Sequence, residues 1–156
     1  MEPLPEAVRE FVAAARVCRI ASVRPDGTPH VIPVCPVFVG DATLYVDLAS
    51  HGVSAAAFRS NPSITVLIDE YHDDWSKLQA VILRCRAEEL AGEEMERAWA
   101  MIREKFPQYV TVDWQPRLTL ALRIDGWTEW GLAVPLSSAI QKSPLSDIES
   151  PHPFLS

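Results

Sequence analysis

The chain has 156 residues, of which 48% are hydrophobic and 22% are charged, a composition typical of one folded domain rather than of a disordered segment. Its 14 Lys and Arg side chains stand against 21 Asp and Glu, and the resulting net charge of −7 argues against a nucleic-acid-binding surface. The longest uncharged apolar run, residues 31–39, is broken by two prolines and is far shorter than the roughly 20 residues that span a membrane. The first residues are acidic where a signal peptide needs basic charge, so we expect a cytoplasmic protein without membrane contacts.

Hydrophobic periodicity predicts helices and strands in a clear chain order. A helix over 5–16 has a proline near its start and apolar side chains at helical spacing. Strand-like alternation follows it, and a turn at 24–27 joins the first two strands. Two prolines inside the second strand favour a position at an edge of the sheet or at a bulge. The predicted strands span residues 17–23, 30–39, 43–48, 64–69, 78–90 and 118–124, and two further helices span 53–59 and 92–105.

Six strands joined by turns and short helices, without regular alternation of strand and helix, predict a mainly β architecture. We expect a closed or nearly closed barrel of six antiparallel strands with short peripheral helices, because closure removes exposed sheet edges. Residues 1–132 would form this domain. Residues 133–156 are rich in proline and serine and lack periodicity, so we expect a tail without a core of its own.

Three cysteines lie far apart in apolar, strand-like segments, at Cys18, Cys35 and Cys85. No Cys-x-x-Cys spacing is present, so we expect buried, reduced thiols rather than a zinc or redox site. The sequence His-Asp-Asp at 72–74 could suggest a metal, but no spaced partner completes a coordination sphere. No Ser-His-Asp triad can be defended either, so no catalytic side chain is assigned.

An ordered set of segments carries a resemblance to a known family. It begins with the hairpin Arg-Ile-Ala-Ser-Val-Arg-Pro-Asp-Gly-Thr-Pro-His-Val-Ile-Pro-Val at 19–34 and continues at 41–46, 59–66, 69–88, 106–109 and 126–127. Together these segments resemble the pyridoxamine-phosphate-oxidase-like split barrels, over roughly residues 11–130. The resemblance implies a six-stranded split β-barrel that forms a homodimer. It also implies an oxidoreductase that binds FMN or the deazaflavin coenzyme F-420 between subunits and passes hydride or electrons to a small organic substrate.

The resemblance further implies where the cofactor binds. In the family, the strand that matches residues 30–34 lies against the ring system, which assigns five residues to the site: His30, Val31, Ile32, Pro33 and Val34. The family's Ser-Arg-Lys stretch, which meets the cofactor phosphate, matches Ser50, His51 and Gly52. Two cations are therefore replaced here. Candidates to compensate are backbone amides at the start of the next helix and three arginines, of which Arg59 is included in the predicted site: Arg19, Arg24 and Arg59.

Four further residues complete the predicted cofactor site: Trp75, Lys77, Gln79 and Trp127. A tryptophan can flank the ring or pack in a core or dimer contact, and both interpretations stay open. In the oxidase itself a glutamine near Gln79 contacts the flavin. The short loop at 50–52 favours FMN, whereas Asp-Asp-Trp-Ser at 73–76 and Phe-Pro-Gln-Tyr at 106–109 favour the deazaflavin.

Two other classes of function stay open. The missing cations at His51 and Gly52 would suit a barrel that has lost its cofactor and serves as a binding or sensor module. A haem-binding variant of the same fold would instead use a histidine as its ligand, with three candidates: His30, His51 and His72.

Overall fold

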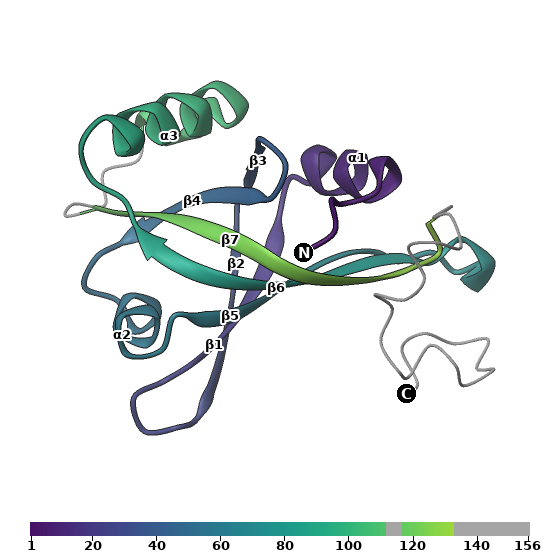
Figure 1. Ribbon diagram of the computed structural model, residues 1–156, viewed down its shortest axis with the longest axis horizontal. Helices are drawn as coiled ribbons and strands as arrows, with labels where there is room; N and C mark the ends of the chain where they lie inside the picture. Colours follow the sequence, from purple (N-terminus) through teal and green to yellow (C-terminus); the bar gives the residue numbers. More distant parts are fainter. Residues whose placement is uncertain (112–116, 133–156) are drawn as a thin grey trace.

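The computed structural model describes residues 1–111 and 117–132, and its main element is one antiparallel sheet of seven strands (Figure 1). The strand order is β2-β1-β5-β6-β7-β4-β3. The strands are β1 (Cys18–Val23), β2 (Pro29–Val34), β3 (Val37–Val39), β4 (Thr43–Ala49), β5 (Ser63–Glu70), β6 (Gln79–Glu89) and β7 (Arg117–Trp130). The helices in these two ranges are α1 (Glu6–Ala14), α2 (Val53–Ser60) and α3 (Gly92–Lys105), with short 3-10 helices η1 (Trp75–Lys77) and η2 (Pro107–Thr111).

The sheet has seven strands where the sequence predicted six, because the predicted strand at 30–39 is broken. Its first part is β2, its second part is β3, and Cys35 and Pro36 lie between them. Pro36 has no backbone N–H to donate to a ladder, so the chain leaves the sheet at this point. The other proline of the segment, Pro33, lies in β2, which pairs with β1 alone. The prediction that the prolines mark an edge strand or an interruption is confirmed.

The break at Cys35 and Pro36 also curls the sheet. β2 and β3 occupy opposite edges of the strand order, yet Val34 and Val37 are three positions apart in the chain. Three peptide units span at most about 11 Å, so the two edges must curl towards each other. The result is a curled antiparallel half-barrel, and the predicted split-barrel fold class is confirmed (Figure 1).

The core lies inside the curl of the sheet. α1 contributes Val8 and Val12, and β1 contributes Cys18 and Ile20, all without exposed surface. A smaller cluster lies under α3, which packs against β3, β4 and β7, and it includes the fully buried Ile102. None of the helices in the described ranges is long and apolar enough to cross a membrane. The predicted tail at 133–156 lies outside the described residues.

β7 is much longer than predicted. The alternation of apolar residues ends at Ile124, but the strand continues to Trp130. The ladder with β6 shifts register between Arg84 and Cys85, and Asp125 is the extra residue of β7 at this bulge. Pairing resumes at Gly126, so one irregular residue hid the second half of the strand from a search for strict alternation.

The ammonium group of Lys105 fixes the break between β2 and β3. It donates hydrogen bonds to the carbonyl oxygens of Ala13 at 3.1 Å, Ala15 at 2.7 Å and Pro36 at 2.8 Å. Each of the three ammonium protons therefore has an acceptor. Burial lowers the pKa of Lys105, and the three carbonyl oxygens offset the cost of burying its charge. The bonds join the end of α3 to the end of α1 and to the closing break.

A buried ion pair joins β4 to β7. The Asp47 carboxylate has no exposed side-chain surface and accepts hydrogen bonds from Arg117 at 2.7 Å and from the Thr119 hydroxyl at 2.8 Å. The Arg117 guanidinium lies 3.3 Å from the centre of the Trp99 ring, a cation–π contact with α3. The charge of Arg117 is therefore satisfied within the described fold.

The substitution Lys105→Met is expected to lower the free energy of unfolding by about 3 kcal/mol, because three carbonyl oxygens lose one charged donor. Urea unfolding followed by circular dichroism measures the change. Lys77→Met is the matched control, since Lys77 is exposed, and its effect should stay below about 0.5 kcal/mol. Equal stability of the two variants would contradict the role given to Lys105.

The cysteines differ in reactivity. Cys18 and Cys85 are buried, as predicted, whereas Cys35 is partly exposed, which corrects the prediction of three buried thiols. Burial raises the pKa of the Cys18 and Cys85 thiols to about 12. Because the thiolate is the reactive form, a disulfide reagent at about pH 8 should modify Cys35 alone in the native protein and all three thiols after unfolding. Rapid reaction of three thiols in the native state would show that the core is open.

Candidate functional site

A cluster of polar side chains lies where the β1–β2 hairpin meets the start of α2. His30 of β2 is partly buried, and its Nε2 atom lies 3.0 Å from the Ser54 hydroxyl oxygen. Its Nδ1 atom lies 3.3 Å from a guanidinium nitrogen of Arg24. A guanidinium group only donates, so Nδ1 is the acceptor and a neutral His30 carries its proton on Nε2, which donates to Ser54. We call Arg24, His30 and Ser54 the α2 cluster.

The helix that meets this cluster begins without a side-chain cap. Its N-cap residue, Gly52, has extended backbone, and the first turn contains no acidic side chain. The first backbone N–H groups of a helix have no partner within it, and they carry the positive end of its dipole. The helix start and the α2 cluster therefore concentrate hydrogen-bond donors at one place. Such an arrangement can hold a phosphate or another anion.

The predicted phosphate loop leads directly into this helix. Ser50 lies in the turn after β4, and His51 is exposed beside it. Arg59, at the other end of α2, donates to the Ser50 carbonyl oxygen at 2.7 Å and forms an ion pair with Glu89 at 3.2 Å. Arg59 thus fixes the loop, while its charge is already paired with a carboxylate.

Among the arginines that could replace the missing cations, Arg24 is the one that the structure places in the α2 cluster. Arg19 lies on the opposite face of β1 and forms an ion pair with Asp69 at 3.6 Å. Ser54 was not singled out in the sequence, and its only signal is a hydroxyl residue in the first turn of a helix that follows a glycine.

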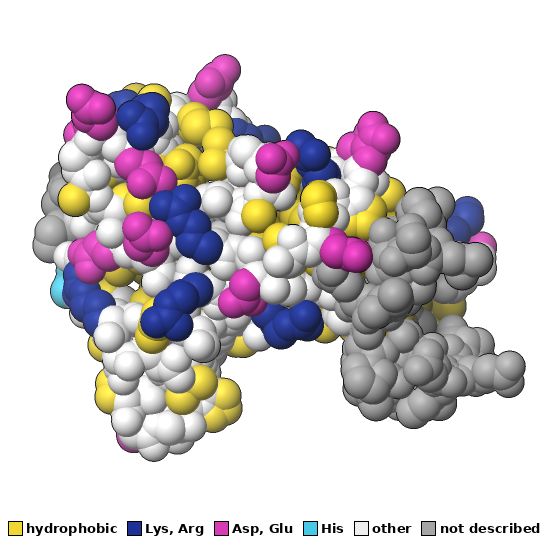
Figure 2. Space-filling view, in the orientation of Figure 1, with side chains coloured by type: hydrophobic (Ala, Val, Ile, Leu, Met, Phe, Trp, Pro, Cys, Tyr) yellow, Lys and Arg dark blue, Asp and Glu magenta, His cyan; other side chains and the backbone are white. Residues whose placement is uncertain are grey.

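The side chains of β2 alternate between the two faces of the sheet. Ile32 and Val34 pack against the core, whereas Val31 and Pro33 are exposed on the outer face, Val31 to 62%. Val23, on the neighbouring strand, is exposed on the same face. Figure 2 shows mainly hydrophobic and uncharged surface on the lobe that Figure 1 assigns to the β1–β2 hairpin, while acidic and basic side chains alternate around α3. We call the outward side chains of this hairpin the hairpin patch: Val23, Pro29, Val31 and Pro33.

The predicted residues at the start of β6 lie far from the α2 cluster. β5 begins beside α2 and runs for 8 residues, roughly 26 Å, before it reaches the loop that contains them. Trp75 is half-exposed in η1, and its indole N–H donates to the Tyr71 hydroxyl at 3.4 Å. Lys77 is exposed and Gln79 is partly buried at the first position of β6. Within one chain, the structure brings His30, Ser50, His51 and Arg59 to α2 and leaves these three residues at the other end.

Trp127 is the largest side chain of the core. It has no exposed surface and belongs to the cluster inside the sheet. In a single chain it therefore acts as a packing residue, and its predicted contact with a cofactor stays a prediction.

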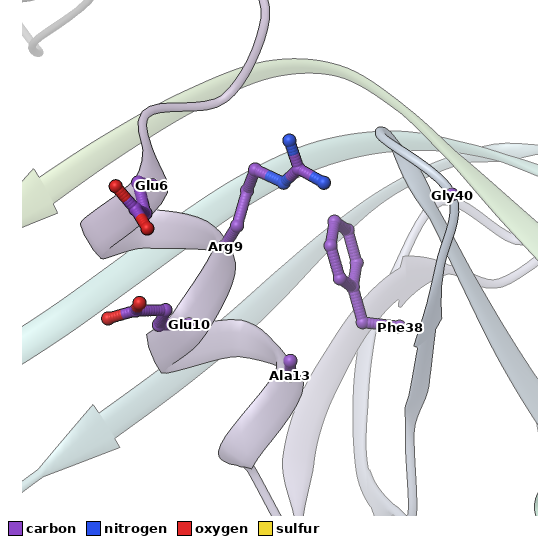
Figure 3. A pocket seen from close by; sticks show the side chains of 6 residues that line it. All are labelled: Glu6, Arg9, Glu10, Ala13, Phe38 and Gly40. Carbon is purple, nitrogen blue, oxygen red and sulfur yellow. The ribbon is translucent and has the colours of Figure 1, made fainter.

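A separate, shallow pocket of about 560 Å³ lies between α1 and β3 (Figure 3). Arg9 and Phe38 face one another across it, and the carboxylates of Glu6 and Glu10 point away from Phe38. Arg9 is exposed and forms an ion pair with Asp41 at 3.2 Å. Among residues 1–111 and 117–132, no three His, Cys, Asp or Glu side chains are grouped so that they could hold a metal ion.

The curled antiparallel half-barrel defines a split-barrel protein. Its candidate site is the group of hydrogen-bond donors at the start of α2. The chain belongs to the pyridoxamine 5'-phosphate oxidase family, because the model of that family matches residues 4–131. This membership confirms the family resemblance found in the sequence. No curated protein sequence matches the chain.

Several solved structures share the fold. A heme binding protein from Mycobacterium smegmatis superposes with a TM-score of 0.72 and 19% identity, covering 83% of this chain and 55% of that protein. The chain thus spans about half the length of that relative. An FAD-binding protein from Mesorhizobium loti has a TM-score of 0.62 and 24% identity over 77% of this chain and 88% of its own. An F-420 reductase has a TM-score of 0.63 and 15% identity over 80% and 98%. At these identities the likeness establishes the fold.

Proposed function

We propose that the chain is an oxidoreductase that binds a flavin-type cofactor, FMN or coenzyme F-420, with the cofactor phosphate at the α2 cluster. The observation that carries this proposal is the convergence of Arg24, His30 and Ser54 on an uncapped helix start. Arg24 supplies a permanent positive charge, and the helix supplies backbone donors. These are the groups that a phosphate monoester or diester needs.

The ring system would lie along β2. This strand forms one edge of the sheet order, so one side of its backbone has no ladder partner among the described strands, and Pro33 removes one more donor. Backbone carbonyl and amide groups at such an edge are available to the heteroatoms of a planar ring. When bound, the cofactor supplies the hydride chemistry. The chain's own residues bind it, orient it and exclude water.

We further propose that two copies of the chain complete the site. The residues predicted to bind the cofactor fall into two groups, one beside α2 and one beside η1, separated by the length of β5. In a two-fold dimer, a contact between α2 of one copy and the η1 loop of the other occurs twice. The exposed hairpin patch supports this arrangement, because apolar groups on an outer sheet face gain from contact with a second copy. Three cysteines without a disulfide support a reducing compartment, the cytoplasm.

Cofactor binding tests the phosphate site. Fluorescence titration with FMN and, separately, with F-420 should show saturable binding of one of them by the wild-type protein. Arg24→Gln and His30→Ala should each weaken cofactor binding by about tenfold or more. The first variant loses a charge-assisted hydrogen bond and the second a neutral one. Arg97→Gln is the control, since Arg97 is exposed on α3 and pairs with Glu93.

The titration also separates the alternatives. Equal affinity in Arg24→Gln and Arg97→Gln would remove the α2 cluster from the site. Failure of the wild type to bind either cofactor would overturn the proposal and favour a binding module without a cofactor.

Dimerisation is tested by sedimentation velocity. The wild-type protein should sediment at twice the mass of one chain, and Val31→Lys should shift it towards the monomer, because a charge would be buried in the hairpin patch. Val110→Lys is the matched control, since Val110 is 70% exposed in η2, away from the patch. A monomeric wild type, or the same shift in both variants, would speak against the proposed interface.

Haem binding is a second candidate, supported by the heme binding relative from Mycobacterium smegmatis. Both ring nitrogens of His30 are engaged, by Ser54 and Arg24, so His30 is poorly placed to ligate iron. His72 lies 3.9 Å from Glu70 at the far end of β5. His51 is exposed in the loop before α2 and is the ligand that we would assign. A Soret band that persists in His51→Ala would exclude this assignment.

A further inference from the structure

The three side chains of the α2 cluster form a hydrogen-bond chain that has one direction. The Arg24 guanidinium can only donate, so it makes Nδ1 of a neutral His30 an acceptor and leaves the ring proton on Nε2. The Nε2–H group donates to the Ser54 hydroxyl oxygen across 3.0 Å. Because this oxygen already accepts from His30, the Ser54 hydroxyl has its own proton left to donate. The chain runs from Arg24 through His30 to Ser54, and it ends in a donor.

The proton of the Ser54 hydroxyl has no acceptor among the residues that the structure describes. Ser54 is 9% exposed, so bulk water has little access to it. It is the second residue of α2, and the side chains of a helix lean towards its N-terminus. The hydroxyl therefore adds one donor to the backbone N–H groups of the first turn, which have no partner within the helix. A ligand oxygen at the helix start would supply the acceptor that all of these groups lack.

A second buried hydroxyl shows that His30 directs its proton to the helix. Ser22 lies directly opposite His30 in the ladder between β1 and β2, and it is 4% exposed. Its hydroxyl has no hydrogen-bond partner within the described fold. Of the two neighbouring hydroxyls, His30 thus donates to the one on α2 and not to the one on β1. The direction of the chain is towards the start of α2.

The start of α2 offers many donors and few acceptors. Its first turn contains no acidic side chain. In the loop before it, the Ser50 carbonyl oxygen already accepts from Arg59 at 2.7 Å. The Gly52 carbonyl oxygen accepts from the Ala56 N–H at 3.2 Å. An oxyanion that keeps a proton on an oxygen facing these groups would therefore meet a further donor where it needs an acceptor.

We propose that Arg24, His30 and Ser54 act in series, and that they select an oxyanion with no proton on the oxygens that face α2. Sulfate, a phosphate diester and a fully ionised phosphate monoester have this form. Ser54 contacts the anion, and His30 is a positioning residue that acts through Ser54. Arg24 fixes the proton of His30 in addition to supplying positive charge. The inference rests on the anion site proposed above, and it specifies the form of anion that this site takes.

Sulfate and hydrogen phosphate are the probes for this preference. At alkaline pH the two anions carry the same charge, but hydrogen phosphate retains one O–H group. In two-dimensional amide NMR of the full-length protein at constant ionic strength, sulfate should shift the resonances of Ser54 and Ala55 in a saturable way. It should bind about fivefold more tightly than hydrogen phosphate. Equal affinity for the two anions, or no saturable shift with sulfate, would overturn the proposed selection.

The variant Ser54→Ala tests the end of the chain and should weaken sulfate binding by about tenfold. Ser22→Ala is the matched control. It removes a hydroxyl that is also buried and also lies next to His30, but this hydroxyl has no partner, so the affinity for sulfate should not change. Equal losses in the two variants would show that Ser54 does not contact the anion.

A double-mutant cycle tests the arrangement in series. His30→Ala should weaken sulfate binding in the wild-type background and cost much less in the Ser54→Ala background, because His30 acts through Ser54. Circular dichroism checks that each variant is folded. Additive losses would show that His30 binds the anion by itself, which would overturn the series.

Titration with FMN and F-420 keeps this inference apart from the proposed function. Selective sulfate binding with a non-additive cycle, but without binding of either cofactor, would support the hydrogen-bond chain and refute the cofactor. Cofactor binding together with equal affinity for sulfate and hydrogen phosphate would support the cofactor and refute the selection by the chain.

Discussion

Three hydrogen bonds from one ammonium group hold the bend on which the barrel depends. Lys105 donates to Pro36 within the closing break and to two carbonyl oxygens at the end of α1. The bend keeps β2 and β3, the two end strands of the sheet order, close in space, although they do not pair with each other. The carbonyl oxygens that accept from Lys105 lie at the end of α1 and at the break between β2 and β3. One cation therefore completes the end of a helix and the closure of the sheet together.

The position of the candidate cofactor site follows from that closure. The curl brings β1 and β2 against α2, although α2 follows β4 in the chain, and so places His30 next to Ser54 across 24 positions of sequence. The same geometry sends the loop between β5 and β6 to the other end of the molecule. A single chain consequently presents two incomplete sets of ligand-binding groups. This division is the physical reason to expect a two-fold assembly in this family member.

The sequence allowed the fold class to be predicted because antiparallel strands carry a local signal. Alternation between buried and exposed residues is visible within β1, β5 and β6 themselves, and it placed these strands to within a residue or two. The strand count was wrong by one because Pro36 breaks a run whose hydrophobicity continues across it. The end of β7 was missed because the bulge residue Asp125 interrupts the alternation. Both errors come from single residues that change backbone geometry without changing composition.

The site was less predictable than the fold, because its contacts are not local. Nothing in the spacing of Arg24, His30 and Ser54 indicates that a helix following β4 will cover the first hairpin. Trp127 shows that residue type alone leaves a role open, since the tryptophan of the motif is buried in the core of the single chain and its contact with a cofactor stays a prediction. The residue types in the sequence indicated which chemistry was available. The curl of the sheet determines which of these residues lie close enough to act on one ligand.

The arginines show how the structure separates binding groups from framework groups. Arg59, Arg117 and Arg123 each lie within 3.2 Å of a carboxylate oxygen, and their charges hold strands and helices together. Other cations of the described residues form no ion pair there, Arg86 and Arg103 among them. Lack of a partner alone is not evidence of a site, because Arg86 is exposed to water, which satisfies it. Arg24 differs from Arg86 in its surroundings, because it lies beside His30 at the uncapped start of α2. A charge without a carboxylate partner indicates a ligand when further donors are gathered around it, and Arg24 beside the uncapped start of α2 satisfies that condition.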